Sequence, residues 1–196
     1  MQARSIEVAK RFNIPIHVRS SFAKEEGTMI VKTKEKVEEI SVTGVTCNKS
    51  ESKVTICAVP DKPGFAAYVF NEISDAGVNV DMIVQNVSHK RLTDISFTVL
   101  QGDLSKALEV TEKIAKDMKA GEVLYNKNIA RVSIVGSGMR SHTGIAAKMF
   151  KVLEEEEINI EMISTSEISI SCIIAQSSAD TAVKMLHKEF KLDMAV

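Results

Sequence analysis

Two stretches of the chain share one pattern of hydrophobic and polar positions. The stretch that begins at Val54 aligns with the stretch that begins at Val132, and in the middle of the alignment Gly64 falls on Gly144, 80 positions further on. The later runs also match if the second copy carries a deletion of seven residues that falls around 88–92, where a hairpin loop is expected. A repeat of this length indicates a duplicated domain and not an array of short repeats.

The first copy has the periodicities of a small mixed sheet. Apolar residues after Gly64 recur at helical spacing, Gly77 is the expected end of that helix, and Asp103 is the expected N-cap of a second helix. The order βαββαβ predicts an α+β fold with a four-stranded antiparallel sheet and two helices on one face, as in ferredoxin-like domains. The expected elements are strands at 54–59, 78–87, 93–100 and 122–125, with helices at 65–76 and 104–118.

The second copy has too few residues after its last helix to complete a sheet. A strand-like run upstream, 40–47, has no place in the first copy, so we infer that it completes the second sheet. The two modules would then be interlocked. The expected elements are strands at 130–135, 158–166 and 168–175, with helices at 143–156 and 178–190. The domain assignment is 53–127 for the first module, and 40–52 with 128–196 for the second.

Residues 1–39 lie outside the repeat. The pattern predicts a helix at 3–12 and strands at 15–19 and 28–31, followed by a solvated linker at 32–39 with six charges in eight residues. A helix with two strands is too small for a domain. We therefore expect this segment to be the trailing edge of a larger one.

Composition narrows the class of protein. The chain has 196 residues, 44% hydrophobic and 26% charged, with a net charge of −1, which predicts a folded globular protein without the basic face of a nucleic-acid binder. It has no apolar run long enough to span a membrane and no signal-peptide core. Its three cysteines are far apart, which fits a reducing compartment. We expect a cytoplasmic protein that contacts neither membrane nor nucleic acid.

Catalytic motifs are scarce. The four histidines fall on different predicted elements without ligand spacing, and no nucleophile elbow, P-loop or zinc-protease motif occurs. Gly136-Ser137-Gly138 follows a strand, but Ser141 stands where a dinucleotide fingerprint needs its third glycine. We therefore predict no catalytic residue, no metal and no cofactor for this chain.

The repeat itself carries the best chemical signal. Gly64 and Gly144 each stand where a strand turns into a helix, whose unpaired N–H groups attract carboxylates. Asp81 and Glu161 begin the second strand of each copy and could hold an ammonium group. A helix end that faced such an acid would recognise an amino acid. The alternative is that the glycines only serve the turns and the acids face solvent.

Several strings resemble the tandem ACT regulatory region of aspartate kinase. They are DKPGFAAYVF, DMIVQN, VGSGMRSHTG and INIEMISTSEI, in this order, and the resemblance covers about residues 40–190. The strings ARSIEVAKRFNIPIHVRSSF and EGTMI resemble the last stretch of that enzyme's catalytic domain. Met1 is then either an internal start, as in regulatory subunits, or the boundary of a fragment. Most of the catalytic domain is absent, so the chain alone should be inactive.

The resemblance implies an allosteric function. In this family the ACT pairs bind lysine, threonine or both and inhibit the phosphorylation of aspartate by ATP, the first step toward lysine, threonine and methionine. ATP and magnesium would belong to the intact kinase, and this chain would form a homodimer through its ACT modules, with a catalytic aspartokinase subunit as a further partner. The alternative is a stand-alone ACT-type sensor of small molecules.

The resemblance also implies effector-binding residues. Glu161 stands where relatives carry Asp, and Thr143 where they often carry Pro or Ser. The turns also differ, DKPG in one copy and MRSHTG in the other, so we expect unequal sites. The MISTSE string resembles the lysine-responsive members, so we expect Glu161 to serve lysine. In the first module the implied residues are Asp61, Gly64, Phe65, Ala66, Asn79, Asp81, Gln85, Asn86 and Ser88. In the second they are Met139, Ser141, His142, Gly144, Ile145, Asn159, Glu161, Ser164, Thr165, Ser166 and Glu167.

Overall fold

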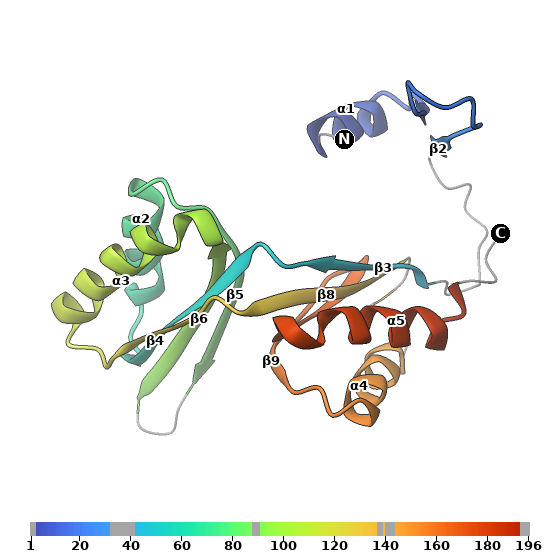
Figure 1. The fold of residues 1–196 in the computed structure, drawn as a ribbon. Helices are drawn as coiled ribbons and strands as arrows, with labels where there is room; N and C mark the ends of the chain where they lie inside the picture. The colour runs from blue at the N-terminus through green and yellow to red at the C-terminus, as the bar shows by residue number, and fades with distance from the viewer. Residues whose placement is uncertain (1–2, 32–41, 88–90, 137–138, 140–143, 193–196) are drawn as a thin grey trace. The chain divides into compact units, whose positions relative to one another are not determined.

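The computed structural model describes residues 3–31, 42–87, 91–136, 139 and 144–192 (Figure 1). The chain divides into two units, Met1–Glu39 and Ile40–Val196, each with its own contacts. The expected linker at 32–39 lies outside the described residues.

The first unit contains the predicted helix and strands. Helix α1 (Ala3–Arg11) is followed by β1 (Ile16–Val18) and β2 (Thr28–Ile30), which pair antiparallel. Many apolar side chains of this unit are exposed, and Phe22 is fully so. A unit that leaves this much apolar surface open buries too little to account for its own folding.

The first ACT-like module has the predicted βαββαβ order. Its sheet runs β5-β6-β4-β7, and helices α2 and α3 lie on one face (Figure 1). The core between sheet and helices includes Val54, Ile73, Phe97 and Ile114, all 1% exposed or less. The elements are β4 (Glu51–Pro60), α2 (Phe65–Asp75), β5 (Val80–Val87), β6 (Leu92–Leu100), α3 (Leu104–Met118) and β7 (Val123–Asn126).

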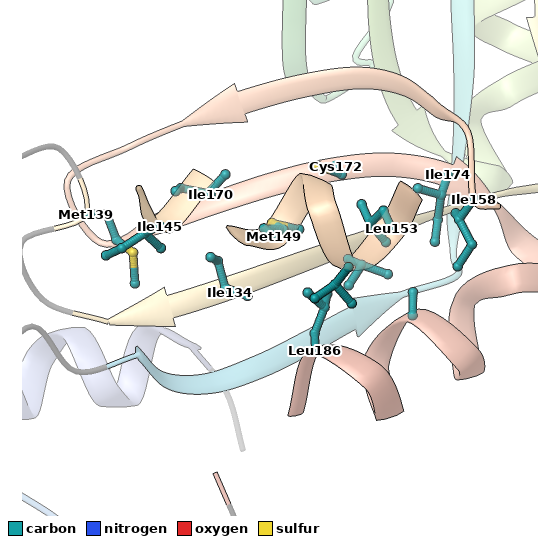
Figure 2. Packing of buried hydrophobic residues seen from close by; sticks show 13 residues of the cluster. Ile134, Met139, Ile145, Met149, Leu153, Ile158, Ile170, Cys172, Ile174 and Leu186 are labelled. Carbon is teal, nitrogen blue, oxygen red and sulfur yellow. The ribbon is translucent and has the colours of Figure 1, made fainter. Parts of the chain in front are cut away.

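The second module repeats this arrangement with a strand from upstream. Its sheet runs β3-β8-β10-β9, and β3 pairs antiparallel with β8, with Asn48 opposite Arg131. Met149 and Leu153 of α4 point at the sheet beside Leu186 of α5 (Figure 2). The elements are β3 (Val42–Asn48), β8 (Ile129–Gly136), α4 (Ile145–Glu155), β9 (Ile160–Thr165), β10 (Ser169–Ala175) and α5 (Ala179–Glu189). The interlocked α+β fold expected from the sequence is thus the observed one.

The registers correct the alignment of the third strands. Phe97 lies opposite Val54, and Cys172 lies opposite Val132, so Phe97 and Cys172 are equivalent. The alignment from the sequence alone differs from this pairing by two residues in the third strand. The hairpin loop of the second copy is therefore shorter by five residues, not seven. In both copies a 3-10 turn follows this strand, at Gln101–Asp103 and at Gln176–Ser178.

The predicted cap of α3 is also wrong in one respect. Asp103 does precede the helix, but its side chain makes no capping hydrogen bond. Its backbone, at φ −96° and ψ −4°, already continues the preceding 3-10 turn. A capping side chain needs the extended backbone of a true N-cap, and this turn removes it.

A small apolar cluster joins the two modules on the faces that carry no helices. Met82 of β5, Met162 of β9, Ile129 of β8 and Ile173 of β10 are each buried to 6% exposure or less and pack together, with Val84 beside them. We call these residues the junction cluster. Because its members come from both sheets, the two modules share a buried contact as well as their connections.

Candidate functional site

The two glycine turns have the same geometry. Gly64 has φ 94° and ψ −16°, and Gly144 has φ 102° and ψ −20°, both left-handed and both directly before a helix. Neither helix has a side-chain cap. In α2 the N–H of Phe65 donates to the carbonyl of Lys62 at 3.3 Å, so the N–H groups that follow it in the first turn are the ones available to an anion. The glycines therefore serve the turns, and the turns leave two exposed helix N-termini.

The acids do not face these turns, which corrects the sequence expectation. Asp81 follows the C-terminal end of α2, and its neighbour Val80 pairs with Val99 at the Glu51 end of the sheet. Gly64 follows Pro60 at the other end. Seven strand residues at 3.3 Å each put about 20 Å between these two levels. The physical reason is that α2 carries the chain along the length of the sheet before β5 begins.

Glu161 contacts two groups of the first module. Lys53 of β4 forms an ion pair with its Oε2, and Asn126 Nδ2 of β7 donates to its Oε1 at 3.1 Å. The side chains of Lys53 and Glu161 are each 21% exposed. A break in the register between β9 and β10 falls beside Glu161, where Ile160 and Met162 pair with successive residues. This bulge leaves Glu161 unpaired in the ladder.

Asp81 contacts a cation of the second module. Arg131 Nη1 of β8 lies 2.5 Å from Asp81 Oδ2, and its Nη2 lies 2.7 Å from Oε1 of Glu51. Glu51 is 3% exposed in its side chain, whereas Asp81 is 52% exposed. Burial raises the pKa of the Glu51 carboxyl, Arg131 opposes this and Asp81 adds to it. One arginine thus bridges a buried carboxylate and an exposed one.

The remaining implied residues of the first module lie at its surface or edge. Phe65 is half-buried against the core, and Asp61 donates its N–H to the carbonyl of Arg91 at 2.9 Å. Ser88 lies outside the described residues. Ala66 is half-buried in the first turn of α2, and Asn79, Gln85 and Asn86 are exposed before or along β5.

In the second module the implied residues divide between core and surface. Met139 and Ile145 are 4% and 9% exposed and belong to the core, so their side chains contribute packing (Figure 2). Ser141 and His142, with Thr143, lie outside the described residues. Exposed positions are Asn159, Ser164, Thr165, Ser166 and Glu167.

Sequence reasoning missed the cations. Lys53 and Arg131 each stand one residue before the matching runs VTI and VSI, and this equivalence was visible in the repeat. Their partners were not visible, because Lys53 and Glu161 are 108 positions apart.

Among the described residues, no group of His, Cys, Asp or Glu could hold a metal ion. In the same part of the chain, no helix has the length and apolar character needed to cross a membrane.

Family models agree with this architecture. The ACT domain model matches residues 53–117, and a second ACT domain model matches residues 132–190. The fold and the duplicated turns therefore define a tandem ACT-domain protein.

Comparison with known proteins gives the family. An aspartate kinase of Stutzerimonas stutzeri is 46% identical over 194 residues, 98% of this chain and 47% of the relative. In the crystal structure of aspartokinase alpha and beta subunits, one chain matches at TM-score 0.73 and 43% identity, covering 78% of this chain and 100% of that one. The regulatory subunit of aspartate kinase from Thermus thermophilus matches at TM-score 0.73 and 37% identity, covering 76% and 99%. The chain belongs to the aspartate kinase family and contains its regulatory ACT region. It spans about half the length of the Stutzerimonas relative.

Proposed function

We propose that this chain binds lysine, threonine or both and transmits feedback inhibition to aspartate kinase. The observation that carries the proposal is coverage: the Thermus thermophilus regulatory subunit matches over 99% of its length but over only 76% of this chain. The part of this chain that such a subunit matches is close in length to the second unit, Ile40–Val196. The reaction to be inhibited is the transfer of phosphate from ATP to aspartate, with magnesium as cofactor of the intact kinase.

The geometry supports a site built from more than one chain. In the first module the glycine turn and the acid lie at opposite ends of the sheet. A ligand that used a helix N-terminus for its carboxylate and an acid for its ammonium therefore needs a second module in the reverse orientation. A homodimer through the ACT modules supplies one. The strands β5 and β9 lie at the edges of their sheets in this chain, so each has an edge on which a strand of another chain could pair.

We propose one further partner and a role for the first unit. A catalytic aspartokinase subunit would provide the kinase activity. Residues 1–39, which form a separate unit, would be the end of a catalytic domain. The three cysteines are unpaired, which fits a reducing compartment such as the cytoplasm.

Ligand binding can be measured directly on the chain. We expect L-lysine or L-threonine to raise the melting temperature and to give saturable heat in calorimetry, with D-lysine as the matched control. A ligand at 100 times its dissociation constant adds about 2.7 kcal/mol to the free energy of unfolding. Sedimentation should show a dimer, and the ligand should lower the dissociation constant of that dimer.

Absence of any shift or heat with both amino acids at millimolar concentration would contradict the proposal. In that case a stand-alone ACT-type sensor of another small molecule is the competing function. A screen of the other amino acids and of nucleobases by the same thermal measurement would distinguish them.

A further inference from the structure

The two cations between the modules occupy equivalent positions of the repeat. Lys53 stands one residue before the VTI run of β4, and Arg131 stands one residue before the VSI run of β8. Each forms an ion pair with the acid of the opposite module, Lys53 with Glu161 and Arg131 with Asp81. The arrangement is reciprocal, because each module contributes one cation and one acid to the two ion pairs.

These ion pairs are partly shielded from water. The side chains of Lys53 and Glu161 are each 21% exposed, and that of Arg131 is 23% exposed. Charges in such surroundings attract each other more strongly than charges at the open surface, and removal of one partner leaves the other uncompensated. Glu161 also accepts a hydrogen bond from Asn126. A ligand ammonium that pairs with Oε2 of Glu161 therefore competes with Lys53 for that oxygen.

We propose that Lys53 and Arg131 form a latch between the modules that competes with the ammonium group of an amino-acid ligand for Glu161 and Asp81. This inference rests on the proposed function, because it concerns how the same acids meet their ligand. When the ligand takes Glu161, the Lys53 pair opens and one link between the modules is lost. Ligand binding and module docking then weaken each other by the same factor, as linkage requires.

The two halves of the latch are unequal. Glu161 is 21% exposed and has two partners, whereas Asp81 is 52% exposed and shares its arginine with buried Glu51. Asp81 therefore offers its carboxylate to a ligand at a smaller loss of existing contacts. We expect the competition to be stronger at Glu161, and Lys53 is the residue on which to test it.

The test compares Lys53→Met with Lys53→Arg in the full chain. The methionine keeps most of the length of the side chain and removes the charge, and the arginine keeps the charge. Calorimetry with L-lysine and L-threonine should show at least fivefold tighter binding of one of them to Lys53→Met than to the wild type. Lys53→Arg should stay within twofold of the wild type. Adding Glu161→Gln to Lys53→Met should remove the gain.

A second readout does not use ligand affinity. A double-mutant cycle of Lys53→Met and Glu161→Gln in urea unfolding should show coupling without ligand and a clear loss of coupling with saturating ligand. Lys53→Gln repeats the cycle if the methionine variant does not fold.

The outcomes separate the two proposals. Binding to the wild type that is equal to or tighter than binding to Lys53→Met would overturn the latch and leave the proposed function intact. Binding of neither amino acid to any variant would overturn both.

Discussion

Glu157 has the left-handed backbone in the second module that Gly77 has in the first. Their φ values are 54° and 68°. Each lies just past the end of a helix, and each donates its N–H to the carbonyl three residues back, Gly77 to Ser74 at 2.7 Å and Glu157 to Glu154 at 2.9 Å. Gly77 ends α2 as the sequence predicted. A glutamate at the equivalent turn carries the strain of its Cβ.

Replacing Glu157 by glycine should therefore stabilise the chain. Relief of the left-handed strain, less the entropy that glycine loses on folding, gives about 0.5–1 kcal/mol. Urea unfolding should show a higher midpoint at an unchanged slope. Glu156→Gly is the matched control, because Glu156 has φ −94° and should lose stability. A shift of the same sign in both variants would contradict the assignment.

Alanine at either glycine turn should destabilise its module. At Gly64 and Gly144 an added Cβ would meet nothing within 4 Å, so the cost comes from the positive φ alone, about 1–2 kcal/mol each. Gly102→Ala is the control, since Gly102 has the same open space without a positive φ. Thermal unfolding of the three variants compares them. Equal melting temperatures would show that the turns tolerate a side chain.

Glu51→Gln should alter how stability depends on pH. Folding raises the pKa of the Glu51 carboxyl, chiefly through burial, so the folded chain holds this proton more tightly than the unfolded chain. The free energy of unfolding therefore falls as pH rises above about 4.3, the pKa of an ordinary glutamate. The loss is complete once the pH exceeds the raised pKa of the folded chain.

Relative to wild type, the Glu51→Gln variant should therefore gain stability between pH 4 and pH 8. Urea midpoints across this range measure the difference, with Glu112→Gln on the exposed side of α3 as control. A difference that does not change with pH would show that Glu51 has no raised pKa.

A residue of the junction cluster should contribute more to the free energy of unfolding than the surface residue beside it. Met162 is 6% exposed, and its neighbour Ile163 is 44% exposed. Met162→Ala should cost about 2–5 kcal/mol, because it opens a cavity between the modules. Ile163→Ala removes a half-exposed side chain and should cost clearly less. Equal costs in urea unfolding would mean that the cluster does not hold the modules together.

The thiols should react in the order of their exposure. Cys47 is exposed, Cys57 is partly buried, and burial raises the pKa of Cys172 to about 12. A thiol-specific reagent at pH 8 attacks thiolates, so Cys47 should react first and Cys172 only on unfolding. Cys47→Ser should remove the fast phase. A fast phase that survives this substitution would place a second thiol at the surface.

The repeat and the periodicities were enough to predict the fold. The runs at 54–59 and 130–135 are strands with helices behind them, and the run at 40–47 had no other sheet to join. These features are local or appear twice, so one sequence contains them. The family assignment likewise depended on strings such as INIEMISTSEI.

The site was predicted less well, because its contacts are not local. The relation of Gly64 to Asp81 was wrong, since element order alone does not show that α2 separates them by the length of the sheet. The ion pair of Lys53 with Glu161 joins residues 108 positions apart, and the bulge beside Glu161 has no sequence signal. Pairings of this kind follow from how two sheets dock, which no spacing within one module contains.

The place of β3 has a consequence for a chain cut by a protease. A single cut after Lys127, between β7 and β8, would give the fragments 1–127 and 128–196. The first fragment would still hold β3, whose residues Val42–Asn48 pair with β8 of the second. The nicked protein should therefore remain one particle in gel filtration and separate only in denaturant. Two connections link the modules, β3 to β4 and β7 to β8, and β3 also pairs with β8. The strand pairing and one connection therefore still hold the modules together after the other connection is cut.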